Sequence, residues 1–149
     1  MNLRQQLDAD MKTAMKSRDS LRLETIRGVR GAIRNKEIDA GGELDDETIL
    51  RVIRTLVKQR SDSIEQYQAA GRSELAEKES AEKGVLEEYL PAGPDPAEIE
   101  RVVVEVIAET GAAGPRDMGK VMKPSLDRLG PAADGKLVSQ TVKRLLADG

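Results

Sequence analysis

Apolar residues recur every three to four positions along nearly the whole chain, which is the period of an α-helix that buries one face. The first such pattern predicts a helix that ends near Lys16, and its apolar residues are Leu3, Leu7, Met11 and Met15. A second helix is predicted from about Asp19 to Lys36. A third begins after Asp45, a good N-cap residue, and stops at Gly71.

A proline-rich segment interrupts these patterns. Before it, Ser73 is predicted to cap a fourth helix in which Gly84 is a weak point. Residues 91–96 read Pro-Ala-Gly-Pro-Asp-Pro and cannot continue a helix, because proline has no backbone N–H to donate. We therefore expect an N-terminal helical subdomain over residues 1–91 and a C-terminal tail subdomain over residues 95–149.

Three more helices are predicted after this boundary. The first spans residues 95–111, starting with a near capping box and stopping at a glycine. The second starts near residue 115 and should bend or end at Pro124, and the last covers residues 134–146. The whole pattern predicts an all-α, multihelical fold.

The composition excludes several classes of function. Charged residues make up 34% of the 149 residues, and no apolar run is long enough to cross a membrane. Cysteine and histidine are absent, which removes thiol chemistry and both the commonest general base and the commonest metal ligand. We expect no cofactor and no metal. Asp8 and Asp10 fall where a signal peptide needs apolar residues, so we expect a cytoplasmic protein.

The net charge of −3 conceals segments of opposite sign. Residues 12–36 hold eight basic and two acidic residues, whereas residues 72–110 hold four basic and eleven acidic ones. Residues 111–149 are again basic, with seven against four. Such alternation serves an anionic partner or lets the segments pair within the protein.

Two glycine-lysine pairs, at residues 119–120 and 135–136, fall where helices are predicted to start. The start of a helix offers unpaired N–H groups to phosphate, and lysine adds a cation beside them. The first pair belongs to a near P-loop, but Val121 replaces the serine or threonine that would hold magnesium, and no strand precedes it. Nucleotide hydrolysis is therefore not expected.

Several long motifs, in the same order, resemble the YqeY family. They are LRQQLDADMKTAMKSRDSLRLETIR, KQRSDSIEQYQAAGRSELAEKES, EEYLP, DMGKVMK and ADGKLVSQTVKRLL. The family is similar to the C-terminal part of GatB in tRNA-dependent amidotransferases. The resemblance implies a larger N-terminal helical part, a three-helix tail and an association with tRNA. Relatives tend to have Gly-Arg-Ala-Asp-Gly before the last helix, and Ala132 replaces that arginine here.

Arg27, Arg30 and Arg34 are the first candidate RNA contacts. Their spacing of three and four residues places them within a narrow arc of the second helix, where they can face phosphates along an RNA backbone. The alternative is that they pair with the acidic residues between 74 and 82 or face water.

Two further groups of basic residues lie in the family motifs. The middle group consists of Lys58, Arg60 and Arg72. The tail group consists of Lys120, Lys123 and Lys136. A helix stop at Gly71 and apolar packing suffice to explain the middle motif, so the structural interpretation is favoured there. For the tail group, close helix packing at Gly119 and RNA contact are two equal interpretations.

The favoured hypothesis is a non-catalytic accessory module that binds tRNA or another structured RNA through these basic residues. One alternative is a carbon-nitrogen ligase with glutamine as amide donor, which the resemblance to GatB implies. Another is a protein-protein adaptor for a synthetase or an amidotransferase. No membrane partner is expected.

Overall fold

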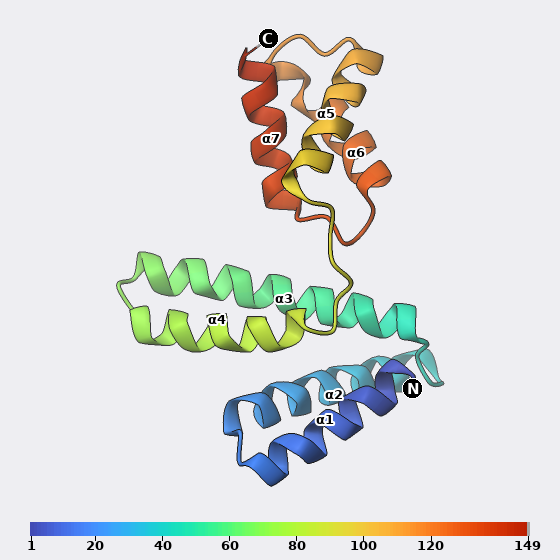
Figure 1. The fold of residues 1–149 in the computed structure, drawn as a ribbon, viewed down its shortest axis with the longest axis vertical. Coiled ribbons are helices and arrows are strands. Elements are labelled where there is room, and N and C mark those ends of the chain that lie inside the picture. The colour runs from blue at the N-terminus through green and yellow to red at the C-terminus, as the bar shows by residue number, and fades with distance from the viewer. Residues whose placement is uncertain (149) are drawn as a thin grey trace. The chain divides into compact units, whose positions relative to one another are not determined.

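The computed structural model describes residues 1–148, which form seven α-helices, one short 3-10 helix and no strand (Figure 1). The predicted all-α, multihelical fold class is confirmed. The chain divides into two compact units, unit 1 at Met1–Leu90 and unit 2 at Pro91–Gly149.

Unit 1 consists of two helical hairpins. Helices α1 (Leu3–Ser17) and α2 (Ser20–Ala40) run side by side, and α3 (Asp46–Ala69) pairs with α4 (Ser73–Glu87) (Figure 1). Their apolar faces meet in one core, whose buried residues are Leu7, Ile26, Val29, Ile33, Ile49, Val52, Ile53 and Leu86. Burial of side chains of this size contributes about 1.5–3 kcal/mol each.

The helix starts follow local capping rules. The Asp45 carboxylate accepts a hydrogen bond from the Thr48 N–H at 2.8 Å, as predicted. At the start of α1, the Asn2 side chain accepts from the Gln5 N–H, and the Gln5 side chain accepts in return from the Asn2 N–H at 3.0 Å. This reciprocal capping box satisfies two donors that the helix leaves unpaired.

Helix α2 is one turn longer than predicted, because it ends at Ala40 rather than near Lys36. Its last turn contains Glu37, which forms an ion pair with Arg4 of α1. The Glu37 carboxylate also accepts a hydrogen bond from the Leu44 N–H at 3.0 Å. These contacts with residues outside the helix anchor a turn that the local sequence pattern does not require.

The start of α4 also differs from the prediction. Ser73 is the first helical residue rather than the cap, and the N-cap residue Arg72 makes no side-chain capping bond. Gly84 does not interrupt the helix, which continues to Glu87. Extensive packing between α3 and α4 supports α4 where its own sequence is weak.

Unit 2 has a separate core between three helices, α5 (Pro96–Thr110), α6 (Met118–Leu129) and α7 (Gly135–Asp148), and the 3-10 helix η1 (Pro115–Asp117) precedes α6. The buried core residues are Ile99, Val102, Val103, Val106, Val121, Val138, Val142 and Leu146. Pro124 lies inside α6 and does not end it. Residues on both sides of the proline, Val121 and Ser125, are buried, so packing offsets the cost of about 3 kcal/mol for an internal proline.

Candidate functional site

Helix α2 carries the three arginines predicted to form a basic ladder. The helix begins after Asp19, whose side chain accepts a hydrogen bond from the Arg22 N–H at 3.1 Å. The buried residues of α2 are Thr25, Ile26, Val29 and Ile33. The three arginines lie outside this buried face and are exposed to solvent. The α2 surface of unit 1 is therefore rich in guanidinium groups.

These arginines differ in their partners. Arg30 Nε lies 3.0 Å from Asp8 Oδ1 of α1, and Arg30 Nη1 lies 3.0 Å from Met11 Sδ. Arg27 and Arg34 form no ion pair with any residue that the structure describes. None of the three pairs with the acidic residues of α4. Two of the three arginines are thus left without an ion-pair partner among the described residues.

The three basic residues of the middle group also differ in whether they form ion pairs. Arg60 of α3 is held by α4, because its Nε lies 3.3 Å from Glu79 Oε2 and 2.9 Å from Glu82 Oε2. Only 29% of the Arg60 side chain is exposed. Lys58 and Arg72 are exposed and form no ion pair within residues 1–148. Arg60 ties the α3–α4 hairpin together, whereas Lys58 and Arg72 are open to a ligand.

In unit 2, arginines pair with the glutamates of α5. Arg144 of α7 lies 3.5 Å from Glu100, and Arg128 of α6 forms an ion pair with Glu109. The hydrogen bonds from Arg128 hold the pKa of Glu109 below its ordinary value, so this carboxylate stays ionised. These pairs join the three helices of the unit.

Lys120 and Lys136 lie in the first turns of α6 and α7, whereas Lys123 lies in the middle of α6. Lys120 Nζ is 3.6 Å from Asp117, and Lys123 is exposed without an ion pair to any described residue. The Lys136 side chain is exposed, and its backbone N–H donates to Asp134 Oδ1 at 3.0 Å. Asp134 therefore caps α7, as predicted, and Lys120 and Lys123 follow one another on α6.

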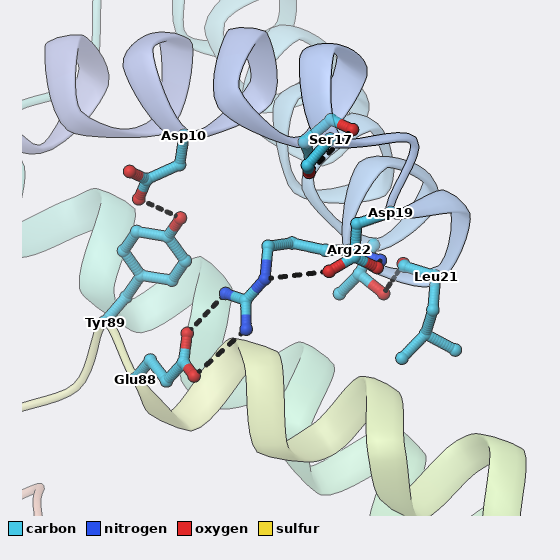
Figure 2. Close-up of polar contacts among 9 residues, drawn as sticks. Asp10, Ser17, Asp19, Leu21, Arg22, Glu88 and Tyr89 are labelled. Carbon is cyan, nitrogen blue, oxygen red and sulfur yellow. Dashed lines mark hydrogen bonds and ion pairs between the residues drawn. The ribbon is translucent and has the colours of Figure 1, made fainter.

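A polar network that the sequence analysis did not identify joins α1, α2 and the end of α4 (Figure 2). The Tyr89 hydroxyl donates a hydrogen bond to Asp10 Oδ2 at 2.5 Å. Next to it, Arg22 Nη1 lies 2.5 Å from Glu88 Oε2, and Arg22 Nε lies 3.5 Å from Asp19. The network lies where the chain leaves unit 1 and fixes that segment to two other helices.

The electrostatics of this network suit a structural role. Burial disfavours the phenolate, and the hydrogen bond to Asp10 disfavours it further, so the pKa of Tyr89 is raised. The hydroxyl therefore stays protonated at neutral pH and acts as a donor. The hydrogen bonds from Arg22 lower the pKa of Glu88, which stays ionised. The one hint in the sequence was that Tyr89 is one of only two aromatic residues.

Within residues 1–148, no group of three or more acidic, histidine or cysteine side chains is arranged to hold a metal ion. No helix in this part of the chain is both long and apolar enough to cross a bilayer. The charged side chains that come together in the structure do so mainly as ion pairs between helices.

The two helical units and their exposed cations define a small all-α protein with basic residues on several helices. The sequence profile of the family described as Yqey-like protein matches residues 4–146. The chain therefore belongs to the YqeY family, as its motifs indicated.

Three curated relatives are each named altered inheritance of mitochondria protein 41, mitochondrial. The protein of Lachancea thermotolerans is 39% identical over 112 residues, which cover 73% of this chain and 60% of the relative. That of Kluyveromyces lactis is 33% identical over 150 residues, or 93% and 81% of the two chains. That of Pyrenophora tritici-repentis is 32% identical over 142 residues, or 94% and 78%. The chain spans only 60% of the length of the Lachancea protein, and it spans more of the other two.

These relatives correct one expectation. All three are named as mitochondrial proteins, which contradicts the expectation of a cytoplasmic location. That expectation rested on the lack of an apolar export segment. This criterion does not separate cytoplasmic from mitochondrial proteins, because mitochondrial targeting segments are amphipathic rather than apolar.

Proposed function

We propose that this protein is a non-catalytic accessory module that binds tRNA or another structured RNA. The observation that carries the proposal is the pair Arg27 and Arg34, two exposed arginines on α2 that form no ion pair among the described residues. A guanidinium group offers a planar fork of donors that matches phosphate oxygens. Cations left unpaired in a protein of net charge −3 are the groups best suited to a polyanion.

The scarcity of aromatic residues limits the mode of binding. Tyr67 and Tyr89 are the only aromatic side chains, and the Tyr89 hydroxyl is committed to Asp10. Proteins that read single-stranded RNA stack its bases on aromatic rings. The proposed interaction therefore depends on backbone phosphates and on the shape of a folded RNA.

Contact with phosphates predicts a strong dependence on salt. If about four phosphates are neutralised, log K should fall against log salt with a slope of about −3 to −4. Fluorescence anisotropy with labelled tRNA over a salt series measures this slope. A protein that shows no binding at low salt would contradict the proposal.

A matched pair of variants separates specific contacts from net charge. Arg27→Ala with Arg34→Ala removes both unpaired arginines of α2. Arg51→Ala with Lys78→Ala removes the same charge from exposed residues of α3 and α4. We expect tRNA affinity to fall at least tenfold more in the first double variant than in the second, since hydrogen bonds to charged groups contribute about 1.5–3 kcal/mol each.

The ligase alternative predicts catalytic turnover by this protein. Robust glutamine-dependent amidation by the purified chain would contradict a non-catalytic role.

The exposed large apolar side chains, Met1, Met15, Ile38 and Val104, come from the N-terminus and three different helices. Single exposed apolar residues are ordinary in folded proteins, so they give no particular support to the adaptor alternative.

A further inference from the structure

Helices α1 and α2 form a groove of about 410 Å³ along their line of contact in unit 1. Its lining includes two apolar side chains, Leu7 and Ile33, which are 1% and 3% exposed and therefore lie at its base. The other lining residues are charged, apart from one glycine, and they are Arg4, Asp8, Arg30, Gly31, Arg34 and Glu37. The groove thus combines an apolar floor with charged walls.

Two ion pairs neutralise four of the five charged residues that line the groove. Arg4 pairs with Glu37, and the Glu37 carboxylate also accepts a hydrogen bond from the Leu44 N–H at 3.0 Å. Both interactions lower the pKa of Glu37, so the carboxylate stays ionised and bound. Arg30 Nε lies 3.0 Å from Asp8 Oδ1. The lining carries three arginines and two carboxylates, so one positive charge is left without a partner.

Arg34 supplies that charge. It is exposed and forms no ion pair with the residues described in the structure. Gly31 lies one turn earlier in the same groove, and a Cβ at that position would meet no atom within 4 Å. There is therefore open space at Gly31, one turn from Arg34, and the unpaired Arg34 gives the groove a net positive charge.

We infer that this groove binds one phosphate group of an RNA backbone, and that Arg34 donates hydrogen bonds to its oxygens. The inference rests on the proposed function and locates one of its contacts. A phosphate chain fits better than an acidic protein segment, because Arg27 is also unpaired and lies seven residues earlier on α2. At 1.5 Å per residue the two positions are about 10 Å apart along the helix, so a polymer with regularly repeated charges can contact both.

The first test compares two charge deletions on the same helix in the 149-residue chain. Lys36 is exposed, forms no ion pair with a described residue and does not line the groove, so Lys36→Ala is the control for Arg34→Ala. We expect Arg34→Ala to weaken tRNA binding about tenfold and to reduce the salt slope by about 0.7–0.9. We expect Lys36→Ala to change affinity less than about twofold. Equal losses in the two variants would overturn the inference.

The second test fills the groove without a change of charge. Gly28 and Gly31 both lie within α2, and a Cβ at either position would meet no atom within 4 Å, but only Gly31 lines the groove. Replacement of either glycine raises helix propensity, so both variants should fold. Gly31→Leu should weaken tRNA binding several-fold, whereas Gly28→Leu should not. A Gly31→Leu protein with unchanged affinity would count against a phosphate in the groove.

A third measurement separates the groove from the proposed function. If the wild-type protein binds no tRNA at low salt, the proposed function fails. Inorganic phosphate then tests the groove alone, through NMR shifts of the Gly31 amide and the Arg34 Nε–H. Shifts in the wild type that vanish in Arg34→Ala support a phosphate site. No shift, or a response to a glutamate-rich peptide without one to phosphate, would overturn it.

Discussion

The Tyr89 hydroxyl donates a 2.5 Å hydrogen bond to the Asp10 carboxylate and so connects the residues that follow α4 to α1 (Figure 2). Beside it, the ion pair between Glu88 and Arg22 connects the same segment to α2. Tyr89 is partly buried, and a hydrogen bond that is shielded from water contributes more than an exposed one. The last residues of unit 1 are therefore held by two other helices.

Tyr89→Phe should destabilise unit 1 by about 1–3 kcal/mol, because it leaves the Asp10 carboxylate without this donor. Tyr67→Phe is the matched control, since the Tyr67 hydroxyl forms no hydrogen bond with a described residue, and it should change stability by less than about 0.5 kcal/mol. Urea unfolding followed by circular dichroism gives both free energies. Equal values for the two variants would show that the Tyr89 hydroxyl contributes nothing.

The stability of unit 1 should fall in acid partly through Glu37. Its ordinary pKa is 4.5, and hydrogen bonds from Arg4 and Leu44 lower its pKa in the folded protein. The folded state therefore binds fewer protons than the unfolded state, so the stabilisation is present above the unfolded pKa and is lost as pH falls through the folded pKa. Glu37→Gln removes this contribution.

The urea midpoint measured between about pH 5 and pH 3 tests this dependence. The midpoint of Glu37→Gln should fall less over this range than that of the wild type. It should still fall to some extent, because Glu88 and Asp45 also have lowered pKa values. Parallel pH profiles for the two proteins would exclude a contribution from Glu37.

The fold was predictable where the causes are local. Helix period and N-caps such as Asp45 and Asp95 depend on a few neighbouring residues, and both caps are observed. Element ends that depend on distant contacts were not predictable. The last turn of α2 is held by Arg4, and α6 continues past Pro124 because both sides of the proline pack in a core.

The candidate site was predictable only as a set of cations. The spacing of Arg27, Arg30 and Arg34 placed them outside the buried face, and the structure agrees. Which of them is neutralised depends on a partner in another helix, as with Asp8 for Arg30. The Tyr89–Asp10 bond spans 79 residues, and no pattern along the chain indicates such a contact. Pairing between helices follows from packing.

In unit 2, Ser125→Ala should increase stability by up to about 1–2 kcal/mol. The Ser125 side chain is fully buried, and its hydroxyl has no hydrogen-bond partner among the residues that the structure describes. The substitution therefore removes the cost of desolvating this hydroxyl and raises helix propensity. Thr141→Val is the contrasting variant, because the Thr141 hydroxyl donates to the Leu137 carbonyl at 2.8 Å. That substitution should lose about 0.5–1.5 kcal/mol. Thermal unfolding that ranks the two variants in the reverse order would contradict this argument.

The segment that enters unit 2 packs too closely for any side chain at Gly93. A Cβ at Gly93 would lie 2.4 Å from the Ala132 carbonyl oxygen, which belongs to the turn between α6 and α7 and cannot rotate away as a side chain can. Gly93→Ala should therefore displace the segment or the turn and destabilise unit 2 by about 1–3 kcal/mol. Gly84→Ala is the control, since a Cβ there meets no atom within 4 Å, and it should stabilise α4 by about 0.5–1 kcal/mol.

Amide hydrogen exchange shows which part of unit 2 the Gly93→Ala substitution disturbs. The Ala133 N–H donates to the Gly130 carbonyl at 3.2 Å, so a displaced turn should exchange this hydrogen faster. We expect faster exchange at Ala133 in Gly93→Ala and wild-type exchange there in Gly84→Ala. A Cβ that lies 2.4 Å from the Ala132 oxygen cannot be accommodated without movement of the segment or the turn. If Gly93→Ala kept both the stability and the Ala133 protection of the wild type, the close approach of Gly93 to Ala132 would therefore have no energetic role.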